Sequence, residues 1–458
     1  MPPHSTISYK ECYKALFRLG IPVLITQIGI IVVSFADTMM VGRYGTDELA
    51  AAAFVNSIFI VVTLMQLGFA SGLTPLVGAL FGEKKLEKVG HTLRGGLQIN
   101  LLLSLSFTIV MGVLYFFLDR FGQKEELLPL IRRYYLIILF SLLPMALFNT
   151  FQQTCNGITD TATPMWFILG SNVLNIAGNY IMIFGHFGCP PLGLAGAGLS
   201  TLFARIAAAV GIVVYFIFRR DFRDYRLGYA SAPQLGDVRR RVWATSYPVM
   251  IQSGVECLLW AFGGIVCGWY GKIQLAAYQV VNTIAQLGFM TYLSFGTATA
   301  ILVANHTGTG DWKGVRRITS AGLHLVLILC TAVCILFIAA GRRLVFLFTP
   351  DSLVISSALG ILLPLVVYQY MDAVQLTYCN AIRGTSFVKP LLWISVITYL
   401  VVGVPVLLLF ADLFEAANTG IYWSFCVALA VASTLLSLSF FSIVRKNSSP
   451  SPDPSPLS

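Results

Sequence analysis

Long apolar runs alternate with short polar connections along almost the whole chain. Each run has roughly the 20 residues that an α-helix needs to cross the hydrocarbon core of a bilayer. The pattern therefore predicts an all-α integral membrane protein with twelve transmembrane helices. The predicted helices lie near residues 16–41, 50–81, 93–118, 133–155, 163–186, 192–218, 243–269, 275–305, 317–340, 354–382, 388–412 and 419–444.

The composition agrees with this pattern. Of 458 residues, 57% are hydrophobic and only 11% are charged, which is unlike a soluble domain. A net charge of +10 is also found in nucleic-acid-binding proteins, but here the basic residues lie in the connections between apolar runs. We therefore expect contact with a lipid bilayer and no nucleic-acid partner. The nine cysteines form no CxxC pattern and lie mostly within apolar runs, as packing residues do.

Basic residues predict the orientation of the chain. With the N-terminus inside, the inner connections and both ends hold about 21 Lys and Arg residues and the outer connections about 8. The positive-inside rule then places both termini in the cytoplasm, in a multi-pass protein of the inner (plasma) membrane. One connection is longer and strongly basic. Its arginines are Arg219, Arg220, Arg223, Arg226, Arg239, Arg240 and Arg241.

An internal repeat organises the chain into two halves, because the same residues recur at a nearly constant offset. The matched positions are Pro22 with Pro248, Gly42 with Gly268, Tyr44 with Tyr270, and Cys155 with Cys379. Six helices per repeat give both halves the same orientation, which is typical of transporters whose binding region lies between the halves. The predicted parts are a cytoplasmic N-terminus (1–15), an N-terminal six-helix lobe (16–218), a basic cytoplasmic linker (219–242), a C-terminal six-helix lobe (243–445) and a disordered cytoplasmic tail (446–458).

Three acidic residues fall well inside predicted spanning helices: Asp37, Glu256 and Asp372. A carboxylate at the centre of a bilayer costs about 2.5–3.5 kcal/mol on insertion scales, so it is expected to face protein or water. Glu256 and Asp372 lie at similar predicted depth, and Tyr368 lies one turn before Asp372 on the same face. We predict that these three residues form a cation-coupling site in the C-terminal lobe, with Na⁺ held at Glu256 and Asp372.

A second polar site is predicted in the N-terminal lobe. Asn175 and Asn179 are one helical turn apart, at a depth comparable with that of Asp37. One carboxylate with two amide oxygens suits a proton or a sodium ion. A structural role is the alternative, since asparagines bridge spanning helices and Glu256 can pair with the buried Arg205 or cap a backbone amide. Gln286 is a further candidate for contacting cargo.

Several chemistries have no matching sequence pattern. The chain contains no GxxxxGK[ST], HExxH or GxSxG motif and no Cys/His metal cluster. ATP hydrolysis and protease chemistry are therefore not expected, and we predict that the protein is not an enzyme and uses no cofactor besides a coupling ion.

The sequence resembles a known transporter family at specific places. The run from Ile21 to Gly42, with AspThrMetMetValGly at its end, and the following GlyThrAspGluLeuAlaAlaAla are similar to the first helix and loop of the MATE family. The segment around Glu256, residues 277–284 and TyrMetAspAlaVal around Asp372 look like the NorM-type branch. The resemblance covers roughly residues 10–445.

The resemblance implies a two-lobed, twelve-helix multidrug efflux protein. By that similarity, it is an antiporter that exchanges Na⁺ or H⁺ for cationic amphipathic drugs by alternating access and contributes to antibiotic resistance. We expect it to act as a monomer. The alternative is a flippase of a lipid-linked precursor in the same broad superfamily. That function would favour a cavity rich in Arg and Lys, whereas the deep charges here are mostly acidic, with Arg205 opposing them.

Overall fold

The computed structural model describes residues 7–231, 235–414 and 416–448, which form helices joined by short connections, without strands. Most of the predicted disordered tail, 449–458, lies outside the described residues. Residues 446–448 do not belong to a disordered tail, because they complete α17 (Ala417–Ser448), whose last turn carries Arg445 and Lys446.

Eleven stretches of the described chain are long and apolar enough to cross a membrane, or twelve if one bent pair is counted as a span. The bent pair is α13 (Ser352–Gly360) with α14 (Leu362–Gly384), which meet at 47°. The prediction of a multi-span, all-α membrane protein is therefore confirmed. The bend occurs where the sequence predicts one continuous helix, 354–382. Gly360 and Pro364 flank the break. Because proline has no backbone N–H, Pro364 cannot donate the hydrogen bond that would continue α13 into α14.

The chain divides into two compact units. The N-terminal unit, as we call it here, is Leu19–Leu258, and the C-terminal unit combines the chain through Arg18 with the chain from Leu259 onward. The described residues between Arg219 and Leu258 fall in the N-terminal unit, and the boundaries of the predicted lobes stay predictions. The division into lobes that move against each other stays a prediction.

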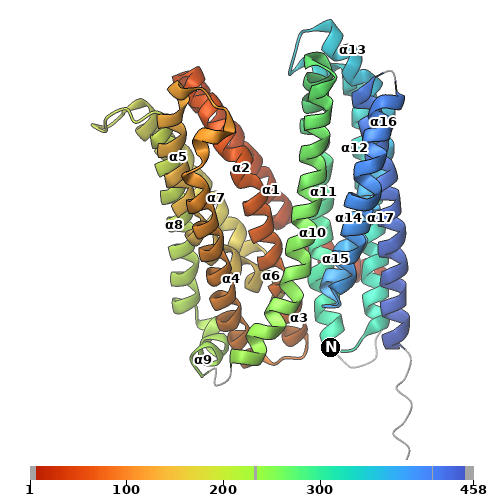
Figure 1. Cartoon of the computed structure of the whole chain (residues 1–458). Coiled ribbons are helices and arrows are strands. Elements are labelled where there is room, and N and C mark those ends of the chain that lie inside the picture. The colour runs from red at the N-terminus through yellow and green to blue at the C-terminus, as the bar shows by residue number, and fades with distance from the viewer. Residues whose placement is uncertain (1–6, 232–234, 415, 449–458) are drawn as a thin grey trace, which may run out of the picture. The chain divides into compact units, whose positions relative to one another are not determined.

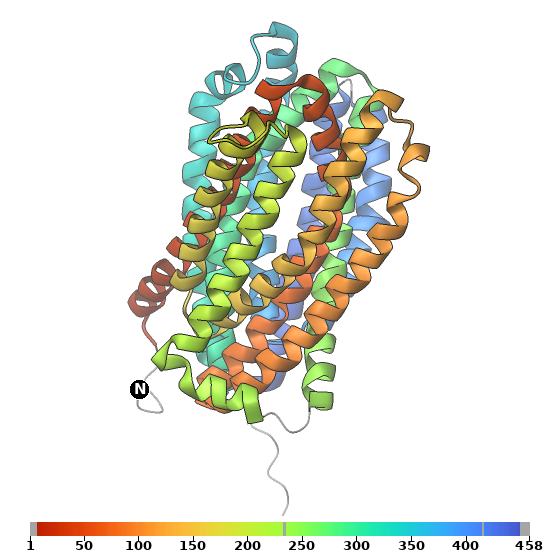
Figure 2. The ribbon, with the colours of Figure 1, turned by 90° about the vertical axis from the view of Figure 1, so that its left-hand side faces the viewer.

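Helices of the N-terminal unit pack as antiparallel neighbours. For example, α7 and α8 lie side by side (Figure 2). The helices that lie wholly or largely in this unit are α1 (Tyr9–Tyr44), α2 (Thr46–Ser71), α3 (Leu73–Gly82), α4 (Leu86–Tyr115), α5 (Leu128–Phe140), α6 (Leu142–Gly157), α7 (Ala162–Phe184), α8 (Leu194–Phe218), α9 (Arg223–Ser231) and α10 (Leu235–Trp269). Short 3₁₀ turns occupy Leu118–Phe121, Glu125–Leu127 and Arg220–Phe222.

The C-terminal unit is built around α14, which packs against both α11 and α17 (Figure 1). Its other elements are α11 (Lys272–Gly308), α12 (Trp312–Phe346), α15 (Lys389–Ser395), a π-helical segment (Val396–Gly403) and α16 (Val404–Leu413). The π-helical segment interrupts the predicted helix 388–412 just before Pro405. A π-helix is rare and marks a place where the regular backbone ladder is displaced.

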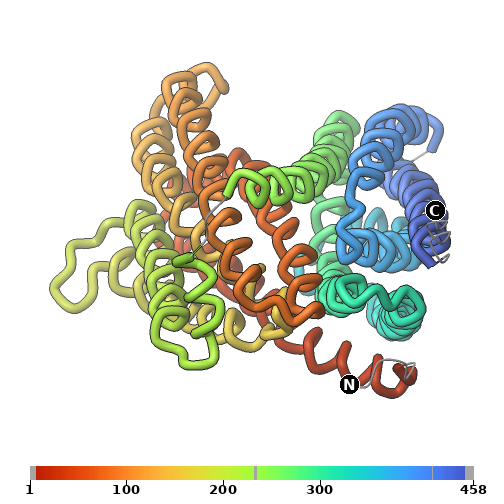
Figure 3. Tube along the Cα trace, turned by 90° about the horizontal axis from the view of Figure 1, so that it is seen from below, coloured from red at the N-terminus to blue at the C-terminus, as the bar shows by residue number. Residues whose placement is uncertain are grey.

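The first turns of α1 belong to the C-terminal unit and pack on α12. The Tyr13 hydroxyl lies 3.2 Å from Nδ1 of His324, and Tyr9 stacks on the same imidazole at 6.2 Å between ring centroids. Figure 3 shows this dark red start of α1 beside the teal α12. Because α1 is one helix through Tyr44, the same helix also carries Asp37, which lies in the N-terminal unit.

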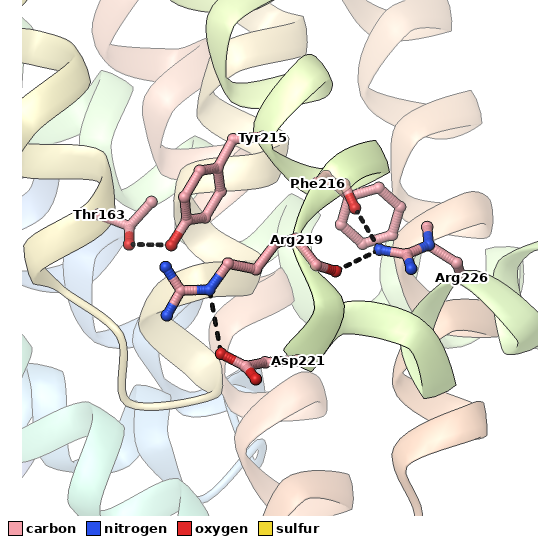
Figure 4. Close-up of polar contacts among 6 residues, drawn as sticks. All are labelled: Thr163, Tyr215, Phe216, Arg219, Asp221 and Arg226. Atoms are coloured by element: carbon pink, nitrogen blue, oxygen red, sulfur yellow. Dashed lines mark hydrogen bonds and ion pairs between the residues drawn. The ribbon is translucent and has the colours of Figure 1, made fainter.

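The described residues of the predicted basic linker, 219–242, are mostly helical. The seventh long helix, α10, begins at Leu235, eight residues before the predicted 243. The turn between α8 and α9 is tied down by arginine (Figure 4). Arg226 Nη1 donates to the carbonyl oxygens of Phe216 and Arg219, and Arg219 Nε donates to Asp221 Oδ2 at 3.0 Å. The two bonds from Arg226 satisfy carbonyls that the end of α8 leaves open. The hydrogen bond to the Asp221 carboxylate raises the pKa of Arg219.

Candidate functional site

The N-terminal unit brings Asp37, Asn175 and Asn179 into one hydrogen-bonded group. Asn179 Nδ2 donates to Asp37 Oδ1, and it lies 3.4 Å from Asn175 Oδ1. Both asparagines are buried, while Asp37 is half-buried. The spacing on α7 explains the arrangement, since residues four apart lie on the same face of a helix.

Helix α8 completes this group with hydroxyls that the sequence pattern did not single out. Asn175 Nδ2 donates to Thr201 Oγ1 at 3.1 Å, and Ser200 Oγ donates to the Asn175 carbonyl at 2.7 Å. The hydroxyl of Thr201 in turn donates to the Ala197 carbonyl. The result is a chain of hydrogen bonds from the carboxylate on α1 through the amides of α7 to α8. Such a chain orients the oxygen atoms that a small cation or a proton would meet.

Arg205 lies one turn beyond Thr201 on α8 and donates from Nη1 to Ser141 Oγ at 2.7 Å. It also interacts electrostatically with Asp37. This hydrogen bond goes to a neutral hydroxyl at the start of α6. An ion pair between Arg205 and Glu256, which the sequence raised as an alternative, stays a prediction. A positive charge near the Asp37 group limits the net negative charge of this site.

In the C-terminal unit, Asp372 and Tyr368 are both buried on α14, with Asp372 only 1% exposed. The Tyr368 ring meets Trp260 edge-on at 5.3 Å and Tyr422 at 6.2 Å between centroids. A buried carboxylate beside an aromatic cluster is a suitable place for a positively charged ligand, because ring faces attract cations.

Glu256 is half-buried on α10 and falls in the N-terminal unit, whereas Tyr368 and Asp372 fall in the C-terminal unit. A cation site shared by the three residues, and Na⁺ held by Glu256 and Asp372, therefore stay predictions. Within the described residues, no group of three or more His, Cys, Asp and Glu side chains is arranged to hold a metal ion. Gln286 is exposed on α11, and its contact with cargo also stays a prediction.

Two buried amides on α14 were missed by the sequence reasoning. Gln369 is 0% exposed and donates from Nε2 to the Ala285 carbonyl at 3.3 Å. Gln375 is 1% exposed and donates from Nε2 to the Tyr399 hydroxyl at 3.0 Å. Both lie three residues from Asp372, so a search for polar residues on the face of the acid would have found them.

A known protein family matches both halves of this chain. A protein-family model described as MatE matches residues 22–181 and 248–409, one match in each half of the internal repeat. A protein of Mannheimia succiniciproducens described as probable multidrug resistance protein NorM is 28% identical over 450 residues, which are 96% of this chain and 96% of its own. A protein of Agrobacterium fabrum with the same description is 25% identical over 456 residues, or 97% of each chain.

Solved structures share the fold at low sequence identity. A structure described as a MOP superfamily transporter from Pyrococcus furiosus has a TM-score of 0.86 at 18% identity, covering 98% of this chain and 100% of its own. The Vibrio cholerae MATE transporter VcmN in its bent form has a TM-score of 0.83 at 18% identity, with coverage of 96% and 98%. These likenesses confirm the predicted twelve-helix, two-repeat fold class.

Proposed function

Because this chain belongs to the MatE family, as its resemblance to NorM-type sequences indicated, we propose that it is a secondary active multidrug exporter. It exchanges Na⁺ or H⁺ for cationic amphipathic organic compounds by alternating access. It acts as a monomer in the plasma membrane. Both of its termini lie in the cytoplasm, an orientation that the distribution of basic residues favours.

The observation that carries this proposal is the burial of carboxylates among apolar helices. Asp372 is buried on α14, and Asp37 accepts a hydrogen bond from a buried asparagine. An acid in such surroundings needs a proton, a metal cation or a positively charged organic group to offset its charge. Inorganic and organic cations then compete for the same acids, directly or through conformation. When the inorganic cation binds and favours one conformation, the organic cation is released, and the reverse also holds. This coupling is exchange.

Aromatic side chains support the assignment of cationic amphipathic cargo. The Trp260 ring lies 4.2 Å from the Phe425 ring between centroids, tilted by 51°, and it meets Tyr368 edge-on, one turn of α14 from Asp372. Ring faces next to a carboxylate bind organic cations through cation–π attraction and apolar contact while tolerating differences in shape. Two relatives of this chain are described as multidrug resistance proteins, which is consistent with broad cargo selection.

The test is efflux of a fluorescent organic cation from vesicles that contain the purified protein. A sodium gradient and a pH gradient are imposed separately, and the matched control is Asp224→Asn, which removes an exposed acid of α9. We expect at least one of the two gradients to drive efflux in the wild type and in the Asp224→Asn control. Efflux that ignores both gradients would refute exchange with these ions.

A further inference from the structure

Apolar and basic side chains are exposed next to one another where α8 ends and α9 begins. Phe218, the last residue of α8, is 77% exposed, and Leu227 on α9 is 51% exposed. Arg220 and Arg223 lie between them in the sequence and are exposed as well. Arg223 and Leu227 are one turn apart, so they share a face of α9. We call these four residues the α9 surface.

Helix α9 is fixed in place by α4, at the lower end of the N-terminal unit (Figure 1). A methyl group on Gly228 would collide with the carbonyl oxygen of Glu87, so the two backbones touch at this glycine. Arg94 on α4 also donates from Nη1 to the Tyr229 carbonyl at 3.2 Å. This contact buries one side of α9 and leaves the α9 surface exposed at a defined position.

The arginines of this segment differ in what they bind. Arg219 donates to a carboxylate, and Arg226 donates to two backbone carbonyls (Figure 4). The guanidinium groups of Arg220 and Arg223 have no hydrogen-bond or ion-pair partner among the described residues. From Arg219 to the end of α9 the chain has four arginines and two aspartates, so the segment is positive overall. Two of its positive charges are therefore available to an anion.

The place of these residues in the chain sets their depth in the membrane. Helix α8 is long and apolar enough to span a bilayer, so its exposed end at Phe218 adjoins the acyl chains. The headgroup layer beyond them is about 5–8 Å deep. Arg220 and Arg223 directly follow Phe218 and lie at the level of the phosphates. A guanidinium group binds phosphate through two parallel N–H donors, while apolar neighbours enter the acyl boundary.

We propose that the α9 surface binds an anionic phospholipid, whose phosphate contacts Arg220 and Arg223 while its acyl chains contact Phe218 and Leu227. A zwitterionic lipid has the same phosphate, but its headgroup also carries a positive charge that the two arginines repel. A soluble phosphate compound has no acyl chains, so it gains nothing from the apolar pair. The inference concerns lipid binding and goes beyond the export of drugs.

The test is photocrosslinking of lipid to the purified, full-length protein in micelles of a neutral detergent. The probe is phosphatidylglycerol with a diazirine on its acyl chain, and the readout is the labelled fraction of the peptide that contains α9. Unlabelled phosphatidylglycerol, phosphatidylcholine with the same acyl chains and glycerol 1-phosphate compete in separate series. The competitor concentration that halves the labelling gives an apparent Kd. Size-exclusion profiles and melting temperatures show whether each variant folds.

The first variant combines Arg220→Gln with Arg223→Gln. A basic residue near an anionic membrane surface contributes about fivefold in affinity, so the apparent Kd for phosphatidylglycerol should rise about 20-fold or more. The matched control combines Lys124→Gln with Lys272→Gln, two exposed lysines that follow the far ends of α4 and α10, and should leave this Kd unchanged. If the double arginine variant does not fold, Arg223→Gln alone decides, with about a fivefold rise expected. An unchanged Kd overturns the proposal.

Competition identifies the ligand. In the wild type, phosphatidylglycerol should compete at about one tenth of the concentration that phosphatidylcholine needs, or less, and glycerol 1-phosphate should not compete. Phe218→Ala with Leu227→Ala should raise the Kd for phosphatidylglycerol, because the lipid loses its apolar contact. Equal competition by the two lipids overturns the preference for an anionic headgroup. Displacement by glycerol 1-phosphate, or an unchanged Kd in the apolar variant, assigns the surface to soluble phosphate compounds and overturns lipid binding.

Discussion

Asn179 on α7 donates a side-chain hydrogen bond to the Asp37 carboxylate on α1, across 142 positions of sequence. The donor is neutral, so this hydrogen bond itself brings no positive charge to Asp37, whose electrostatic partner is Arg205 on α8. The second amide, Asn175, and the hydroxyl of Thr201 extend the same set of bonds to α8. Asp37 on α1 is thereby linked through hydrogen bonds to α7 and α8.

Replacing Asn179 by Leu removes this donor. A hydrogen bond to a charged group contributes about 1.5–3 kcal/mol, so gradient-driven efflux should fall about tenfold or more. The rate is measured in vesicles with a fluorescent organic cation. Asn100→Leu is the control, because Asn100 is an equally buried amide that donates to the Gly96 carbonyl of its own helix. Equal efflux from Asn179→Leu and the wild type would remove the amide from the transport mechanism.

Glu256→Gln removes a carboxylate from the middle of α10 and keeps its shape. Drug resistance of cells should be abolished while the amount of protein in the membrane stays the same, because the charge and not the fold is lost. Growth in drug and quantitative membrane blots measure the two effects. Asp224→Asn, at an exposed position, should leave resistance unchanged. A Glu256→Gln strain that grows like the wild type in drug would exclude Glu256 from coupling.

Asp372→Asn should weaken ion-stimulated efflux in reconstituted vesicles. The buried carboxylate is replaced by an amide that binds neither a proton nor a cation strongly. Stimulation is the ratio of efflux with and without the gradient, and we expect it to fall toward one. Thr377→Val serves as control, since that hydroxyl on the same helix donates only to the local Ala373 carbonyl. Full stimulation in Asp372→Asn would rule out a coupling role.

The orientation can be tested with one native and one introduced thiol. Cys189 is exposed in the connection between α7 and α8, which the charge distribution places outside. Arg240→Cys introduces a thiol near the start of α10, on the predicted cytoplasmic side. An impermeant maleimide added to whole cells should label Cys189 and should label position 240 only after the membrane is opened. Labelling of position 240 in intact cells would reverse the predicted topology.

The packing of α9 should depend on pH at the alkaline end. Burial raises the pKa of Tyr225 to about 12, while a tyrosine in an unfolded chain titrates near ~10. The folded protein holds this proton more tightly, so the contribution of Tyr225 to stability is complete below about pH 10 and is lost as pH rises toward 12. Tyr225→Phe cannot ionise, so its Tm should fall less than that of the wild type over this range. If the Tm of the wild type and that of Tyr225→Phe fall in parallel as pH rises, the pKa of Tyr225 does not differ between the folded and unfolded states.

Much of the candidate site was accessible from sequence because unusual residues in a uniform background stand out. Asp37, Glu256 and Asp372 are conspicuous in apolar runs, and the spacing of Asn175 and Asn179 puts both amides on one face. Polar residues that lie among other small or polar residues were harder to recognise. Ser200 and Thr201 contact Asn175 only because α8 packs against α7, which local spacing does not report.

The sequence alone determined the spanning helices, the duplicated halves, the expected orientation and the acids buried among apolar residues. These properties depend on runs of neighbouring residues, since the free energy of placing a helix in lipid is close to a sum over its side chains. Only the tertiary structure decided that Asn179 meets Asp37, that the start of α1 packs on α12, that a bend separates α13 from α14, and that Gln369 faces Gly288. The three contacts join residues far apart in the chain, and they depend on how closely particular helix faces approach, which hydropathy does not encode. The bend changes the direction of the chain without changing the hydropathy of the run.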